Sequence, residues 1–530
     1  MKKEKGMKER GFVGGAVILG VSAIFVRLVG FFFRIYLSNA MGAQGMGVYS
    51  LIMSVYALTC TLATSGIATA VSRLVAEQMS LRNEANAKRV LRRAVSLSLI
   101  LGCIVGVILF LSASFIGGQV MSDERTILSL RILAPGLPFL SMSSCFRGYF
   151  IARRRVGNPA SAQVVEQLFK MAFIILLLGQ AIPMGIEYAC AVVVMGMTAG
   201  EAVCFICTYA GYIMQKRRDN NRKKADANGV TRQIIEIILP ISVTACIRSA
   251  LRLFEDILVM RGFKIFSGDS DIATGTYGML KGMAMPLLLF PLSLMSSFVI
   301  TLTPEISRLR AREEYMRLEF TIGRILQYTC CGGLLIVCVF MTFSRELGML
   351  VYKEQGVGEL LCQLSFLCPF MCLESVTVSI LQGLGEQKAS AAYNLMDCGL
   401  RVALIRALIP LSGTVGFMWM IAASNLFTSV LNLHRLLRIL PIRFRFNEWV
   451  VRPGIAAAAS SQVIKTVYQY HFLQSMDARF SLILGIVIVC AAYTLLLLFL
   501  GCVNTSDIEW VTNKLWPGAK QPKMDKEIAC

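Results

Sequence analysis

Charged side chains interrupt several of the long apolar stretches in this sequence. Arg27 and Arg34 lie in the first stretch, residues 11–37, which contains no acidic residue. Seven residues make nearly two helical turns, so both guanidinium groups are expected on one helix face. Guanidinium groups bind phosphate and pyrophosphate through paired hydrogen bonds. The pair is therefore a candidate phosphate-binding surface, and snorkelling or an ion pair with another helix is the structural alternative.

A second group of charges lies near the middle of the chain. Arg248, Arg252, Glu255 and Asp256 share one apolar stretch. Arg252 and Asp256 are four residues apart, and part of this group is expected to pair internally. If this stretch faces the first one across a cavity, its arginines and the lysine of the next stretch would complete a basic wall. The predicted substrate-binding residues are Arg27, Arg34, Arg248, Arg252 and Lys281.

Acidic residues inside apolar stretches are the candidates for ion pairs or for coupling to an ion gradient, because each is costly to immerse in lipid. Two of them have a basic residue one turn away and are expected to be neutralised on their own helix: Glu166 by Lys170, and Asp397 by Arg401. Glu201 and Glu374 have no such neighbour and are the stronger candidates for a proton or ion site. The predicted coupling or ion-pair residues are Glu166, Glu201, Asp256, Glu374 and Asp397.

The elements that must position these residues are membrane-spanning helices. A span needs about 20 apolar residues, and the chain contains about fourteen stretches of that kind. The fold class expected is an all-α polytopic membrane protein. The predicted spans are 11–37, 46–71, 94–117, 127–151, 159–181, 186–213, 233–261, 276–303, 321–343, 358–382, 389–410, 413–437, 453–471 and 481–502.

Lysine and arginine collect in every second gap between these stretches. Short loops rich in basic residues stay on the cytoplasmic side, so a multi-pass protein of the cytoplasmic membrane with both termini cytoplasmic is predicted. The net charge of +21 is thereby assigned to topology and to contact with anionic lipid. Nucleic acid is not an expected partner, because no basic stripe is interleaved with stacking aromatic residues.

Cofactor and enzyme chemistry find little support in the sequence. The 17 cysteines lie largely in apolar stretches, where cysteine behaves as a small hydrophobic residue. Cys204 and Cys207 form a single C-x-x-C without a second pair, and the chain has two histidines, so no metal centre and no cofactor are expected. No loop is long enough to carry a catalytic constellation, and the protein is predicted not to be an enzyme.

The two halves of the chain resemble each other, which predicts two parallel six-helix bundles around a central cavity, as in transporters. Tyr49 and Ser72-Arg73 are echoed by Tyr277 and Ser307-Arg308, and Pro135 by Pro369, at offsets between 228 and 235. The predicted domains are an N-terminal bundle (1–214), a cytoplasmic linker (215–231), a C-terminal bundle (232–440), two additional transmembrane helices (441–505) and a cytoplasmic tail (506–530).

Several motifs resemble the SpoVB-type polysaccharide and lipid-linked oligosaccharide exporters of Gram-positive bacteria. They are FVRLVGFFFRIYLSNAMGAQGMGVYSL, TLATSGIATAVSRLVAE, FRGYFIARRRVGNPASAQVVEQ, YGMLKGMAMPLLLFPLS, LTPEISRL and ILQGLGEQKASAAYNLMDCGLRVALI, between about residues 11 and 450. The resemblance implies membership of the superfamily that joins multidrug extruders, polysaccharide exporters and the lipid II flippase. In the lipid II flippase group, arginines on helices 1 and 7 hold a pyrophosphate. Arg27 matches the first of these arginines within the motif F-x-R-x-x-G-F. Arg34 is a looser match, offset by about one residue from the position of an arginine in that group. The acid that the group carries just after helix 1 is absent here, where Gly42-Ala43-Gln44-Gly45 stands instead.

The function implied is alternating-access flipping of an undecaprenyl-pyrophosphate-linked saccharide, either lipid II or a polysaccharide repeat unit. It would serve cell-envelope or spore-cortex synthesis. Expected partners are this lipid substrate, membrane lipid and envelope-synthesis enzymes. The alternative is a multidrug extruder that exports organic cations by proton or sodium antiport, which should carry an uncompensated acid on helix 1 or helix 7 together with aromatic residues.

Overall fold

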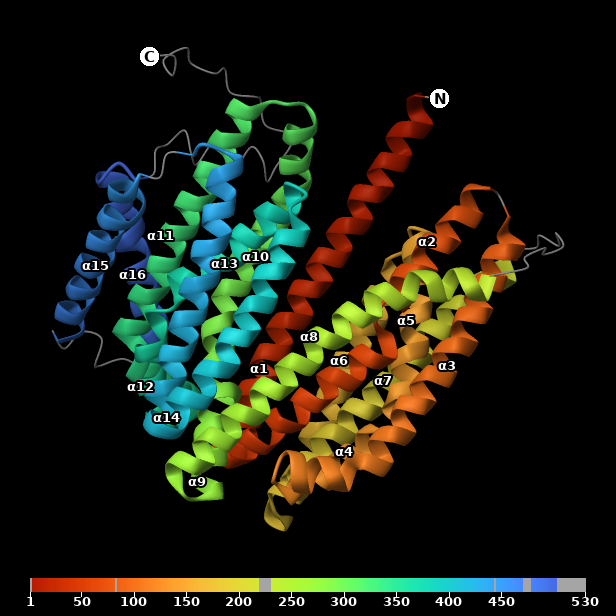
Figure 1. Cartoon of the computed structure of the whole chain (residues 1–530), viewed down its shortest axis with the longest axis horizontal. Helices are drawn as coiled ribbons and strands as arrows, with labels where there is room; N and C mark the ends of the chain where they lie inside the picture. Colours follow the sequence, from red (N-terminus) through yellow and green to blue (C-terminus); the bar gives the residue numbers. More distant parts are fainter. Residues whose placement is uncertain (1, 82, 219–229, 443–444, 470–477, 503–530) are drawn as a thin grey trace. The chain divides into compact units, whose positions relative to one another are not determined.

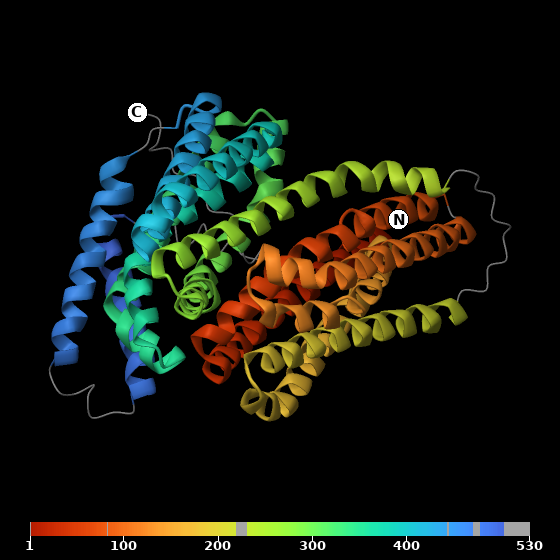
Figure 2. The same cartoon turned by 60° about the horizontal axis from the view of Figure 1, so that its bottom comes forward.

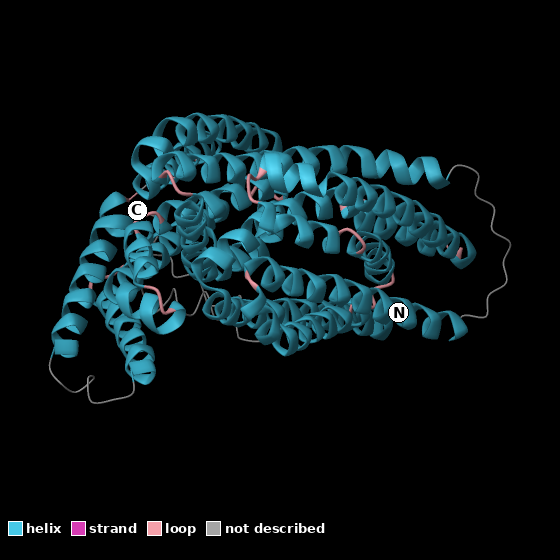
Figure 3. Cartoon of the chain, turned by 90° about the horizontal axis from the view of Figure 1, so that it is seen from below, coloured by secondary structure: helices cyan, strands magenta, loops and turns pink. Residues whose placement is uncertain are grey.

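The computed structural model of the chain describes residues 2–81, 83–218, 230–442, 445–469 and 478–502. Across these residues the backbone is helical, with short 3₁₀ and π segments, and no strand occurs among them (Figure 3). Inside a lipid bilayer a helix satisfies its own backbone hydrogen bonds, which explains why apolar sequences of this length adopt it.

Two helices are far longer than a bilayer is thick, and each breaks at a glycine. Helix α1 (Lys2–Thr64) has φ 67° and ψ −175° at Gly42, and α14 (Gln387–Ile439) has φ 57° at Gly413. Positive φ is accessible to glycine without the steric penalty that a Cβ brings. These breaks coincide with the gaps expected after residues 37 and 410, so each long helix contains two of the predicted spans.

Eight helices of the described residues are long and apolar enough to cross a membrane, and two bent helix pairs raise the number to ten. The pairs bend by 46° between α4 (Ile127–Leu133) and α5 (Gly136–Ala152), and by 57° between α12 (Gln355–Ser365) and α13 (Cys368–Gly383). The sequence predicts about fourteen spans. That number is reached from ten when each half of α1 and of α14 is counted as a separate span and α10 and α15 are added.

The described residues divide into two compact units (Figure 1). One unit contains residues 1–286 and 401–420, and the other contains residues 287–400 and 421–530. The further elements of the first unit are α2 (Ile67–Ser80), α3 (Glu84–Phe115), η1 (Ile116–Val120), η2 (Glu124–Thr126), α6 (Gly157–Ala181), η3 (Ile182–Met184), α7 (Ile186–Arg218), α8 (Val230–Ser267), α9 (Ser270–Tyr277) and η4 (Gly278–Ala284).

The core of the first unit lies among α2, α3 and α5. Buried Val71, Leu91 and Phe146 pack there. Small residues allow these helices to approach closely: a Cβ on Gly102 of α3 would lie 2.8 Å from the Cα of Pro138 in α5. Close packing of small residues is a usual means of helix association in membranes, where lipid removes the hydrophobic driving force.

The second unit is built around α11 (Tyr315–Leu347) and α13. Its core includes Ile322, Val376 and Leu436. The tyrosine hydroxyl of Tyr493 in α16 donates a 2.8 Å hydrogen bond to the carbonyl of Cys331, which attaches α16 to α11. The remaining elements are α10 (Met285–Ala311), η5 (Gly348–Tyr352), η6 (Asn447–Val451), α15 (Arg452–Gln469) and α16 (Ala478–Phe499).

Candidate functional site

The second half of α1 packs along α8 in the first unit, and the two helices run in opposite directions (Figure 2). Thr61 shares a 2.9 Å hydrogen bond with Ser249, and Ser54 donates one of 2.6 Å to Asp256. Segment η4 packs against α1 as well. A Cβ on Gly278 would overlap the carbonyl of Ala43, so glycine is required for this approach. Segments predicted as helices 1, 2, 7 and 8 thus meet in one place.

Three of the predicted charged residues, Lys281, Asp256 and Arg34, converge there. The Nζ atom of Lys281 in η4 lies 2.9 Å from Oδ1 of Asp256 in α8. The hydroxyl of Ser54 donates to Oδ2 of the same carboxylate, and the buried ring of Tyr277 lies beside them. Lys281 also lies 5.9 Å from the ring centroid of Phe417. The carboxylate therefore holds the lysine in a half-buried ion pair. Each partner gives up hydrating water when it forms the contact with the other.

Arg34 is bound to the backbone of η4. Its Nε donates to the carbonyl of Gly282 and its Nη2 to the carbonyl of Lys281, each at 3.0 Å. η4 is a π-helix of seven residues, a conformation that shifts carbonyls out of the normal helical pattern and is common at functional sites. The planar guanidinium fork suits two adjacent carbonyls. Arg34 thus fixes the backbone that carries Lys281.

The other predicted cations present exposed side chains in the first unit. Arg27 lies two turns before Arg34 on α1, and Arg248 and Arg252 lie two turns and one turn before Asp256 on α8. The expected pairing of Arg252 with Asp256 along α8 is replaced by the contacts of Asp256 to Lys281 and Ser54. An additional cation joins the group, because Nε of Arg401 lies 3.7 Å from Oε1 of Glu255.

The predicted acidic residues fall into separate places. Asp397 and Glu374 belong to the second unit. Asp397 is buried and accepts a 2.5 Å hydrogen bond from Ser424, and Glu374 is half-buried on α13. Glu166 and Glu201 belong to the first unit, where Gly200 of α7 allows Glu166 to lie against that helix.

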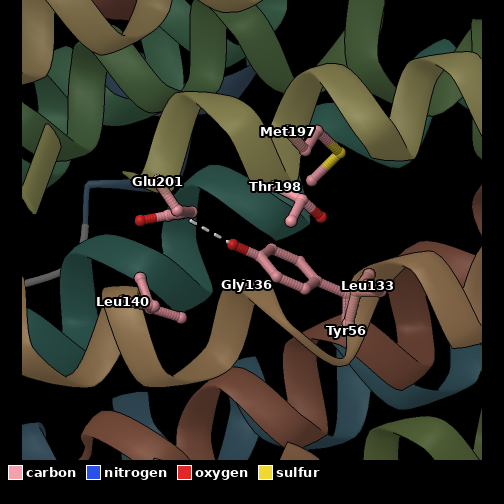
Figure 4. Close-up of a pocket in the computed structure, with 7 residues that line it drawn as sticks. All are labelled: Tyr56, Leu133, Gly136, Leu140, Met197, Thr198 and Glu201. Atoms are coloured by element: carbon pink, nitrogen blue, oxygen red, sulfur yellow. Dashed lines mark hydrogen bonds between the residues drawn. The ribbon is translucent and has the colours of Figure 1, made fainter. Parts of the chain in front are cut away.

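Glu201 faces a small pocket of its own. The hydroxyl of Tyr56, from the second half of α1, donates a 3.0 Å hydrogen bond to Oε1 of Glu201 in α7 (Figure 4). The pocket is lined by these two residues and by Leu133, Gly136, Leu140, Met197 and Thr198. Among the described residues, no group of three or more His, Cys, Asp and Glu side chains could hold a metal ion.

Sequence reasoning missed three residues that complete these contacts. Ser54 and Tyr56 are polar groups inside an apolar segment, and Arg401 was assigned to a partner on its own helix. Ser54 and Tyr56 carry a weak signal in the sequence, since polar side chains in a span usually face another helix. Nothing in the sequence links Arg401 to Glu255, which lies 146 positions away.

A family model of polysaccharide biosynthesis proteins matches residues 12–310, which is more than half of the chain and includes most of α1 and all of α8 and η4. The chain belongs to the polysaccharide biosynthesis protein family. Similar proteins include stage V sporulation protein B of Bacillus subtilis (strain 168), which is 24% identical over 473 residues, covering 86% of this chain and 91% of that protein. The lipid II flippase MurJ of the same organism is 22% identical over 425 residues, covering 75% of this chain and 77% of that protein.

Two solved structures have a fold similar to that of this chain. The lipid II flippase MurJ in an inward closed conformation superimposes with a TM-score of 0.69 at 13% identity, over 94% of this chain and 99% of that one. An inward-facing multidrug-resistance MATE transporter of the MOP superfamily gives a TM-score of 0.62 at 14% identity, over 80% of this chain and 98% of that one. They confirm the expected all-helical, multi-pass membrane fold.

Proposed function

We propose that this protein is a flippase that moves an undecaprenyl-pyrophosphate-linked saccharide across the cytoplasmic membrane by alternating access. The saccharide would be lipid II or a polysaccharide repeat unit, used in cell-envelope or spore-cortex synthesis. The observation that carries the proposal is the convergence of Arg34, Lys281 and Asp256 where α1, α8 and η4 meet. Membership of the polysaccharide biosynthesis protein family and the MurJ-like fold support it.

The charges at this place suit a pyrophosphate. Five cations, Arg34, Arg248, Arg252, Lys281 and Arg401, lie on α1, α8, η4 and α14 with two carboxylates, Glu255 and Asp256. The excess is three positive charges. A pyrophosphate that approaches Lys281 would compete with Asp256 for the ammonium group, while Arg34 keeps the η4 backbone in place. Exposed Arg248 and Arg252 are then available to supply bidentate hydrogen bonds.

The orientation we propose has both termini cytoplasmic, so that the basic loops stay inside. The membrane potential acts on a cationic site with about 2.3 kcal/mol per charge per 100 mV. An inside-negative potential therefore favours return of the empty, positively charged site towards the cytoplasm. Binding of the anionic headgroup cancels this charge and allows the loaded site to move outward.

Leaflet exposure of the lipid-linked precursor tests the proposal. Cells depleted of the protein are complemented with wild type, Arg252→Ala or Arg232→Ala, and the outer-leaflet precursor is quantified. Arg232 is the matched control, because it is an exposed arginine on the same helix that pairs with Glu236. We expect wild type and Arg232→Ala to restore exposure and Arg252→Ala to fail. Unchanged precursor exposure on depletion, together with loss of cationic-dye efflux, would show a multidrug extruder instead.

A further inference from the structure

The Glu201 pocket lies in the first unit, and its polar contacts are separate from those of Arg34, Lys281 and Asp256. Four elements form it: Tyr56 comes from α1, Leu133 from α4, Leu140 from α5 and Glu201 from α7. The tyrosine ring and the carboxylate point towards each other across the pocket (Figure 4). Among the described residues Glu201 takes part in no ion pair within 4.0 Å, and its hydrogen-bond partner is Tyr56.

The charged and titratable groups around Glu201 come from every helix packed against it. Glu166 and Lys170 approach from α6, Arg147 from α5, and Tyr56 and Cys60 from α1, while Cys204 lies one turn along α7. Glu166 also lies near the thiol of Cys204. Two carboxylates and two cations thus form a group that is neutral when both acids are ionised. Uptake of one proton by Glu201 gives it a net positive charge.

The lining of the pocket favours a proton over a metal ion as its occupant. Sodium and other hard cations require several oxygen ligands. Here Leu133, Leu140 and Met197 supply apolar walls, and the oxygen-bearing side chains of the lining are those of Glu201, Tyr56 and Thr198. One carboxylate and two hydroxyls suffice to bind a proton and are fewer than the about six or more oxygen ligands typical of a hard cation.

We propose that Glu201 is a proton-binding site whose protonation is coupled to the transport cycle. Ionised Glu201 accepts the hydrogen bond from Tyr56. When a proton adds to the carboxylate, the neutral acid becomes a donor, and the Tyr56 hydroxyl rotates to accept from it. Tyr56 thereby links the protonation state of α7 to the second half of α1, the same segment that contacts Asp256 through Ser54. The coupling rests on the proposed flippase function, whereas proton binding does not.

Proton binding is measured directly by infrared titration of the purified protein in lipid. A protonated carboxyl has a C=O stretch distinct from that of a carboxylate. Acidification protonates other acids of the chain as well, so the Glu201 band is obtained as the difference between the wild-type and Glu201→Gln spectra. We expect this difference to contain one protonated-carboxyl band, which shifts in Tyr56→Phe, a variant that keeps the ring and removes the hydroxyl. The matched control is Glu236→Gln, an exposed acid on α8, which should leave the band unchanged. A band of equal intensity and position in Glu201→Gln and wild type would overturn the assignment.

Coupling is measured in proteoliposomes containing lipid-linked saccharide. An imposed pH gradient should change the wild-type flipping rate severalfold and should have no effect on Glu201→Gln, which should still flip without a gradient. A response to a sodium gradient and none to a pH gradient would overturn the proton assignment. If wild type flips lipid but ignores the pH gradient, coupling fails and the flippase function stands. If wild type moves no saccharide, the function fails and the infrared titration still decides whether Glu201 binds a proton.

Discussion

The ammonium group of Lys281 and the carboxylate of Asp256 form a 2.9 Å ion pair between η4 and α8. The charge of Lys281, whose own backbone carbonyl accepts a hydrogen bond from Arg34, is thus already neutralised in the absence of substrate. A phosphate ligand must displace Asp256 to reach it, which makes the carboxylate an internal competitor of the substrate.

Removal of this competitor should strengthen binding. In Asp256→Asn the amide keeps the volume of the side chain but no longer attracts Lys281. We expect the affinity for an undecaprenyl pyrophosphate to rise by about fivefold, equivalent to about 1 kcal/mol, the usual size of a partly exposed ion pair. Binding to the purified protein in detergent measures this. Lys281→Met should lower affinity, and equal affinities in all three proteins would contradict competition.

Arg34 should contribute to stability through the two carbonyls of η4. A lysine at this position can reach one carbonyl but lacks the planar fork. Arg34→Lys is therefore expected to lose about 1.5–3 kcal/mol of unfolding free energy, the range for hydrogen bonds made by charged groups. Thermal unfolding in detergent gives the value. Arg232→Lys, at an exposed surface position, serves as control and should stay within about 0.5 kcal/mol of wild type.

Two segments predicted to lie on the external side are joined by polar contacts in the first unit. Arg125 Nη1 lies 3.0 Å from Asp271 Oδ1, and Lys264 Nζ donates to the carbonyl of Ser122 at 2.6 Å. Opening towards the outside requires these segments, which precede α4 and follow α8, to separate. Joining Ser122→Cys and Lys264→Cys with a short bifunctional thiol reagent should therefore abolish flipping in proteoliposomes.

The parent protein and the two variants with only one of the introduced cysteines receive the same reagent as controls, all in a background where the exposed Cys103 is replaced by serine. Their flipping should continue, and a reducible reagent should restore flipping of the double variant on reduction. Undiminished transport by the crosslinked double variant would show that the two segments do not separate.

The break in α1 should depend on glycine at position 42. Its φ of 67° and ψ of −175° fall in a region essentially restricted to glycine, and a Cβ there would contact nothing within 4 Å. The cost of Gly42→Ala is therefore purely conformational, and we expect about 1–3 kcal/mol of destabilisation. Gly179→Ala is the matched control, since it also contacts nothing but lies inside helix α6. Alanine should be neutral or stabilising there, as differential scanning calorimetry can show. A smaller loss at position 42 than at 179 would contradict the argument.

The apolar segments could be located from the sequence because a bilayer imposes one local requirement on every span, namely a long apolar helix. For the same reason the breaks near Gly42 and Gly413 were expected, since the polarity of the sequence changes there and glycine accepts positive φ. The candidate cations on α1, α8 and η4 were found as charges in apolar segments. The assignment of two six-helix domains and of cytoplasmic termini stays a prediction.

The partners of these charges were decided by tertiary structure. Asp256 has a suitable arginine four residues earlier, yet it pairs with Lys281, 25 positions later, and Glu201 meets Tyr56 across 145 positions. Helical periodicity determines which residues share a face of one helix, and this information is local. Which faces then meet depends on the approach of whole helices, permitted by glycines such as Gly278 and by the π-turns of η4. Sequence alone therefore determined the membrane helices and the charges within them, while packing between helices decided which charges are neutralised.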